Sequence, residues 1–107
     1  DNDVLEGAGG FDQLFGGAGD DIFVLGSGPI TIADSIGDFD TGDQIDLSEQ
    51  VNGVDDVSGV VTYDSATGAL LVGGETAFNV QASGGGIPAQ VEVIFEDSAG
   101  AAQTAVV

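Results

Sequence analysis

The chain has no positively charged side chain. Among its 107 residues there is no Lys, Arg or His, whereas Asp and Glu number 19, so the formal net charge is -19. Side chains therefore cannot form ion pairs with one another, and only water or metal cations remain to neutralise the carboxylates. Because nothing in the chain can neutralise a phosphate, nucleic acid is excluded as a partner and an anionic membrane surface is disfavoured.

Cysteine, methionine and tryptophan are also absent. Without Cys there is no disulfide, and a small, loop-rich domain of this kind needs another stabilising element, for which a bound metal is the usual choice. No apolar run approaches the length of a membrane span, so we expect no membrane insertion. Neither a Met nor a signal-peptide pattern opens the chain, and we expect further repeats to precede Asp1.

What the chain does contain is a nine-residue repeat. Three aspartates recur nine residues apart, and each is followed two places later by a large apolar residue. The aspartates are Asp3, Asp12 and Asp21, and the apolar residues are Leu5, Leu14 and Phe23. An isolated Asp-Gly cluster ordinarily marks a turn. Copies in register indicate instead a repeat architecture, in which each unit buries its apolar side against its neighbours.

Each repeat divides into six loop-like residues and a strand-like triplet. The glycine content disfavours a helix. The triplets 4–6, 13–15 and 22–24 suit a coil of short parallel strands with their central apolar residues inward. Residues 25–47 are interpreted as the closing turns, with a strand at 31–33, an acidic loop at 34–43 and a last strand at 44–47.

The repeat disappears from about residue 50. Residues 60–63 and 69–72 flank a turn that contains Gly68, which predicts a β-hairpin. Further strands are expected at 76–81 and 90–96, the latter alternating apolar and polar residues. The sequence therefore predicts an all-β fold, with a short parallel β-roll of nonapeptide repeats in a first domain, residues 1–48. Antiparallel strands of a second domain, residues 49–107, cap its open end.

The repeated aspartates suit calcium. Ca²⁺ takes six to eight oxygen ligands in flexible geometry, whereas Mg²⁺ demands a tight octahedron and keeps its waters. Successive loops fall on opposite sides of the coil, so the Asp3 loop, loop 16–21 and loop 34–43 share one side. We expect one ion between Asp3 and Asp21, and a second where Asp21 faces Asp38 or Asp43. On the other side Asp12 faces Ile30, which predicts a weak or empty site.

The stretch Gly16–Val24 matches every position of the GGxGxDxUx nonapeptide, and the chain resembles the repeats-in-toxin (RTX) family. In that family the carbonyls at positions one, two and four and the aspartate at position six bind calcium. The resemblance also extends to the acidic segment 38–48, which in the family completes the last site. The implied ligands are Asp1, Asp3, Gly7, Ala8, Gly10, Asp12, Gly16, Gly17, Gly19, Asp21, Asp38 and Asp43.

Residues 49–107 resemble, more loosely, the C-terminal target domains of proteins exported by type I secretion systems. The resemblance implies a secreted or cell-surface-attached module that folds on binding calcium, with calcium ions and the secretion machinery as its partners and a large adhesin as its parent. The alternative is a calcium-dependent polysaccharide- or surface-binding accessory module of a secreted epimerase, protease or lipase.

An enzyme is not expected. A nucleophile would lack its usual base, since His, Lys and Cys are absent. Composition leaves open a carboxylate pair for glycoside hydrolysis. However, the regularly spaced aspartates are already assigned to metal sites, and there is no Trp to stack against a sugar.

Overall fold

The computed structural model describes residues 4–6, 13–26 and 33–107. In this part of the chain there are ten β-strands, one 3-10 helix of three residues and no α-helix, so the prediction of an all-β fold is confirmed. None of its helical segments is long and apolar enough to cross a membrane. The elements are β1 (Val4–Glu6), β2 (Gln13–Leu14), β3 (Ile22–Val24), β4 (Asp34–Ile36), β5 (Gln44–Asp46), η1 (Val57–Gly59), β6 (Val61–Asp64), β7 (Ala69–Val72), β8 (Glu75–Val80), β9 (Glu92–Glu96) and β10 (Ala102–Val106).

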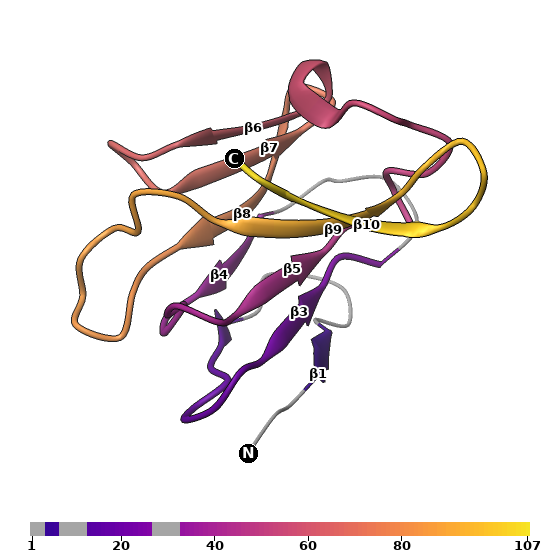
Figure 1. Ribbon diagram of the computed structural model, residues 1–107. Helices are drawn as coiled ribbons and strands as arrows, with labels where there is room; N and C mark the ends of the chain where they lie inside the picture. The colour runs from indigo at the N-terminus through magenta and orange to yellow at the C-terminus, as the bar shows by residue number, and fades with distance from the viewer. Residues whose placement is uncertain (1–3, 7–12, 27–32) are drawn as a thin grey trace.

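The strands form two five-stranded sheets, in the orders β1-β3-β5-β9-β10 and β2-β4-β8-β7-β6 (Figure 1). The first five strands alternate between the two sheets, and within each sheet they pair in parallel. Leu5 lies opposite Phe23, two repeats later, and Phe23 lies opposite Ile45. Leu5 and Phe23 therefore stack as the nine-residue period predicts for strands of the same side, and Ile45 extends the stack beyond the repeats.

One strand of the coil lies later in the chain than predicted. Residues 31 and 32 fall outside the described residues, Ala33 is not in a strand, and the strand is β4, where Ile36 is buried opposite Leu14. The next residue fits this register: a Cβ at Gly37 would overlap the ring of Phe15, which follows β2. The acidic loop therefore begins at residue 37, and the strand predicted at 44–47 is confirmed as β5.

The predicted hairpin is confirmed as β6 and β7, which pair antiparallel, with Gly68 in the turn at φ +81°. The strand predicted at 76–81 is β8, and that predicted at 90–96 is β9. The cap differs from the expectation where it joins the coil, because β8 pairs in parallel with β4 and β9 in parallel with β5. Both sheets of the coil thus continue into the cap, since β8 and β9 run in the coil's strand direction.

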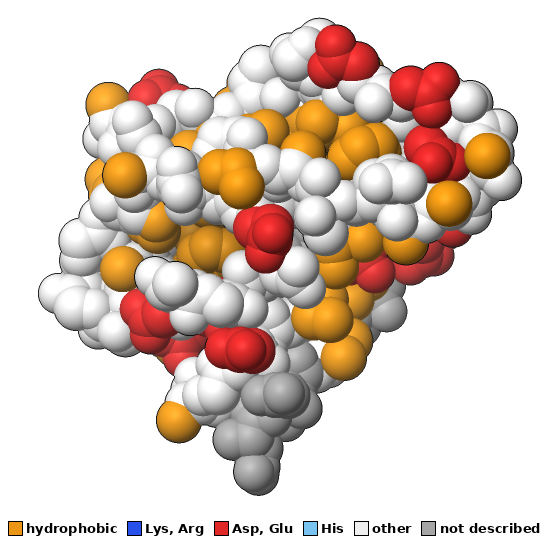
Figure 2. Space-filling view, viewed as in Figure 1, with side chains coloured by type: hydrophobic (Ala, Val, Ile, Leu, Met, Phe, Trp, Pro, Cys, Tyr) orange, Lys and Arg blue, Asp and Glu red, His pale blue; other side chains and the backbone are white. Residues whose placement is uncertain are grey.

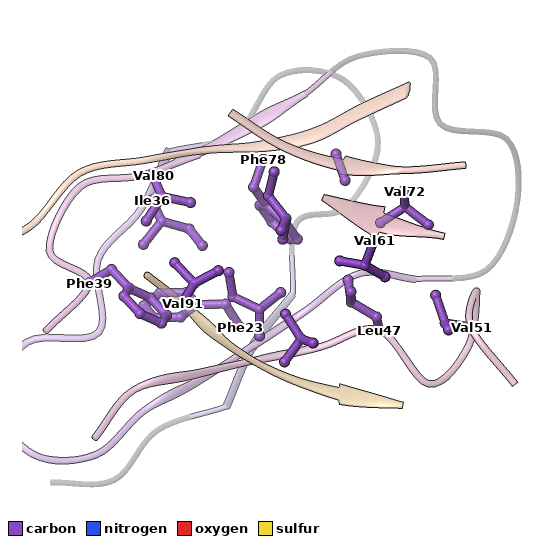
Figure 3. Close-up of a cluster of buried hydrophobic side chains, with 14 of the residues drawn as sticks. Phe23, Ile36, Phe39, Leu47, Val51, Val61, Val72, Phe78, Val80 and Val91 are labelled. Carbon is purple, nitrogen blue, oxygen red and sulfur yellow. The ribbon is translucent and has the colours of Figure 1, made fainter. Parts of the chain in front are cut away.

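A single apolar core lies between the two sheets (Figure 3). The predicted inward residues Leu14 and Phe23 are buried in it, and Leu5 packs against it. Phe78 and Val80 of the cap meet Ile36 of the coil in the same cluster. The core and both sheets therefore run across residue 48, and a domain boundary at that residue stays a prediction.

A continuous core predicts that damage to the cap destabilises the coil. Leu70 of β7 is fully buried, so Leu70→Ala should lower the free energy of unfolding by about 2–5 kcal/mol. Amide hydrogen exchange in saturating calcium should show faster exchange in β3 as well as in β8. Leu71→Ala is the matched control, because its half-buried side chain lies on the opposite face. Protection lost in β8 while β3 stays unchanged would mean that the halves unfold separately.

Candidate metal centre

The loops that precede β3 and β5 lie side by side because those strands pair in register. Asp21 and Asp43 each stand directly before their strand and are 22 residues apart in the chain. The backbone N–H of Asp21 donates to Oδ1 of Asp43 at 2.8 Å, and the N–H of Gln44 donates to the carbonyl of Asp21 at 2.9 Å. Both aspartates are buried, with exposed fractions of 0% and 2%.

A second carboxylate joins the same two loops at their other end. Asp38 accepts hydrogen bonds from the N–H of Gly16 at 2.9 Å and from the N–H of Gly17 at 2.7 Å, one at each of its oxygens. Gly17 and Gly19 have φ angles of +79° and +98°, which favour glycine over any residue with a side chain. The repeat's glycines thus shape a loop whose backbone faces the acidic loop.

Two glycines also make room for the carboxyl groups of loop 16–21. A Cβ at Gly16 would overlap the carboxyl group of Asp21, and a Cβ at Gly42 would overlap that of Asp20. Glycine at the first position of the repeat is therefore required by close packing against the aspartate at the sixth.

Phe39 fixes the acidic loop over the core. Its side chain is 5% exposed, and its ring centroid lies 6.1 Å from that of Phe23. Its backbone N–H donates to the carbonyl of Gln81 at 2.8 Å. Asp38 and Asp43, on either side of Phe39 in the sequence, are held at the neighbouring loop by this anchor.

The electrostatics of the centre favour an added cation. Burial raises the pKa of the Asp43 carboxyl above the ordinary value of 3.8, although the N–H groups of Asp40 and Asp21 oppose this shift. The negative charges of Asp21 and Asp40 raise this pKa further. Ionised carboxylates are costly to bury without a counter-charge, and this sequence contains no basic residue to supply one.

The available donors are all oxygens, which fits calcium rather than a softer metal. The residues that would hold the ion are Asp21, Asp38 and Asp43, with the carbonyls of Gly16, Gly17 and Gly19. In residues 4–6, 13–26 and 33–107 no three acidic side chains are gathered closely enough to hold a metal. Asp38 and Asp43 each accept two backbone N–H groups, one at each carboxylate oxygen.

The structure thus brings together five of the predicted ligand positions: Gly16, Gly17, Asp21, Asp38 and Asp43. Gly19 lies in the same loop. Six predicted ligands fall outside the described residues, so the site between Asp3 and Asp21 and the site on the opposite side stay predictions. These six are Asp1, Asp3, Gly7, Ala8, Gly10 and Asp12.

Sequence reasoning missed two acidic residues of these loops. Asp20 packs against Gly42, and Asp40 accepts hydrogen bonds from the backbone and hydroxyl of Ser83 at 3.2 and 3.0 Å. Asp20 adjoins the motif's aspartate and could have been noticed on that ground. Asp40 could not, because its partner lies 43 residues away in a segment without a repeat.

Comparison with known proteins bears on the same stretch. Residues 1–29 match the family model of the RTX calcium-binding nonapeptide repeat (4 copies). This segment is an RTX calcium-binding module. No curated protein and no solved structure matches the chain. The RTX match ends before β4, so the acidic loop and the cap lie beyond it. RTX repeat proteins are typically extracellular, and their nonapeptides bind calcium.

Crowding at Gly16 should be sensitive to a single methyl group. Gly16→Ala is expected to lower the free energy of unfolding by about 1–3 kcal/mol, because Asp21 must move to admit the Cβ. Gly59→Ala is the control, since a Cβ there meets open space without a positive φ, and its effect should stay within about 0.5 kcal/mol. Urea unfolding in saturating calcium measures both. Equal effects would show that Gly16 is not closely packed.

The stability of the protein should depend on pH in opposite directions with and without calcium. The folded state raises the pKa of Asp43, so its ionisation destabilises the fold as pH rises. Backbone N–H groups lower the pKa values of Asp56 and Asp97, whose contribution is therefore lost at acid pH. In calcium-free buffer, stability should rise from pH 7 toward the ordinary Asp value of 3.8 and fall below it. The net charge of -19 acts in the same direction above that value.

With saturating calcium, acidification from pH 7 should destabilise throughout, because protons compete with the ion for carboxylates. Urea midpoints in saturating calcium and the β circular dichroism signal in calcium-free buffer, each followed across the pH range, test the contrast. Parallel curves in the two buffers would contradict a carboxylate metal centre.

Proposed function

We propose that this chain is a calcium-triggered folding module at the C-terminal end of a protein exported by a type I secretion system, with a large surface adhesin as the parent. One observation carries the proposal: buried Asp21 and Asp43 join two loops in a chain that has no basic residue. A fold built around such a pair needs a cation from outside, and the RTX repeats are calcium-binding.

Without calcium, two costs oppose folding. Carboxylates brought together by the stacked loops repel one another. The glycine-rich loops also lose more backbone entropy than other sequences when they become ordered. Bound calcium supplies the counter-charge, and because the unfolded chain has no preformed site, the binding free energy adds to the folding free energy.

The position of the centre couples binding to the rest of the fold. The two loops lead into β3 and β5, and β5 pairs with β9 of the cap. An ion that fixes the loops therefore fixes the register of the sheet onto which β9 and β10 are added. In a cytosol poor in calcium the chain stays unfolded and can pass through a secretion channel, whereas folding follows outside the cell.

A polysaccharide-binding role is the less favoured alternative. The chain has no Trp and a single tyrosine, Tyr63. The Tyr63 hydroxyl donates to the carbonyl of Pro88 at 2.6 Å, and the side chain is half-buried. The tyrosine therefore joins two segments of the cap and does not present an open stacking surface.

Circular dichroism during a calcium titration tests the folding switch. The β spectrum should be weak in excess chelator and appear as calcium is added. Asp21→Asn should raise the calcium midpoint by about 10- to 100-fold, the cost of losing one charged ligand. Glu75→Gln removes the same charge from an exposed position and should leave the midpoint within about twofold. A fully formed β spectrum in chelator would refute the switch, and equal shifts in the two variants would refute the assignment of Asp21.

A further inference from the structure

A cavity of about 500 Å³ adjoins the acidic loop. It lies between loop 37–43 and the segment that leads into β9. Its lining includes Phe39, Asp40, Asp43, Val91, Glu92 and Val106. This volume suits an organic group or a side chain and far exceeds the space needed by a single ion.

The walls of the cavity combine apolar surface with negative charge. Phe39 and Val91 are buried and form an apolar floor, whereas Val106 is 57% exposed at the rim. Hydrogen bonds hold two carboxylates in place, because Asp40 accepts from Ser83 and Glu92 accepts from Gln44 Nε2 at 3.0 Å. Red carboxylates and orange apolar side chains share the face shown in Figure 2, with no basic residue among them. A ligand complementary to this cavity is a cation on an aliphatic stem.

The rim of the cavity is also the edge of a sheet. β10 is the last strand of its sheet and, in the described residues, pairs with β9 alone. Residues 101–107 carry no charged side chain, although charge is a usual protection of an exposed strand edge. Val106 belongs both to β10 and to the cavity lining. An extended peptide paired with β10 therefore runs beside the cavity.

We propose that the cavity and the edge of β10 bind an extended segment of another protein, with a Lys or Arg side chain of that segment in the cavity. The cationic head lies against Asp40 and Glu92, and the aliphatic stem lies along Val91 and Val106. A second copy of this chain cannot be the partner, because it has neither Lys nor Arg to offer. The proposal does not depend on the export role.

Two-dimensional NMR of the calcium-saturated protein at physiological salt tests this site. The probe is a capped five-residue peptide of alternating Val and Thr with Lys at its centre, and the matched peptide carries norleucine there. The Lys peptide should shift the amide signals of Val91, Glu92 and Val106 and bind with a Kd of order 1 mM, as expected for one small anchor. The norleucine peptide should bind at least about threefold more weakly.

Glu92→Gln should weaken binding of the Lys peptide by about three- to tenfold, because the cationic head of the Lys loses one carboxylate partner. The new amide oxygen can still accept from Gln44, so the fold is retained. Glu96→Gln is the control: it removes the same charge from a half-buried position on the same strand, outside the cavity. The Glu96→Gln variant should bind the Lys peptide with the same Kd as the unsubstituted chain, within about twofold.

Several results would overturn the proposal. If the Lys and norleucine peptides bound with equal affinity, the charge of the peptide would have no role. If Glu92→Gln and Glu96→Gln weakened binding of the Lys peptide equally, the peptide would be attracted to the acidic surface as a whole and not to the cavity. If a single capped lysine bound as tightly as the Lys peptide, pairing of the peptide with β10 would contribute nothing to binding. A failure of calcium-dependent folding would appear beforehand in the calcium-saturated spectrum, which separates it from a failure of this site.

Discussion

Burial of carboxylates without a basic partner is the constraint on which the fold depends. The Asp43 carboxylate accepts the backbone N–H groups of Asp21 and Asp40 as partial compensation, yet burial still raises its pKa. Backbone dipoles alone thus leave part of the cost of this charge uncompensated. Most proteins would place a Lys or Arg here. This chain has none, so the stability of the loop pair is open to control by whatever cation its surroundings supply.

The period of the sequence predicts which side chains point inward but not every strand. Leu14 and Phe23 follow the repeat and are buried. The strand after β2 could not be located from the pattern, because residues 30, 32 and 36 are all isoleucine. Ile36 pairs opposite Leu14, and the contact between Phe15 and Gly37 fits that register. This is a tertiary contact that no local propensity reveals. The parallel pairing of β8 with β4 and of β9 with β5 could not be predicted for the same reason.

The adjacency of the two loops was more predictable than the hydrogen bonds between them. Asp38 and Asp43 could be placed opposite loop 16–21, because alternate loops of a coil share a side. The hydrogen bonds that these carboxylates accept from backbone N–H groups could not be predicted. The period of the sequence gives the position of a carboxylate along the coil but not its side-chain rotamer. These bonds join the two loops, because backbone amide dipoles of loop 16–21 point at the carboxylate oxygens of Asp38 and Asp43.

Loop 37–43 has neighbours on both of its faces, and this makes it more than the end of a repeat array. Asp38 and Asp43 bond to loop 16–21 on one face, while Asp40 bonds to Ser83 on the other, where the cavity lies. Asp43 also donates its backbone N–H to the carbonyl of Asp40 at 3.0 Å and accepts the N–H of Asp40 at 2.9 Å, so the two faces are linked within one short turn. An ion that orders the first face therefore orders a wall of the cavity. Any ligand of the cavity must in turn favour the ordered loop, because coupling between two binding sites is reciprocal.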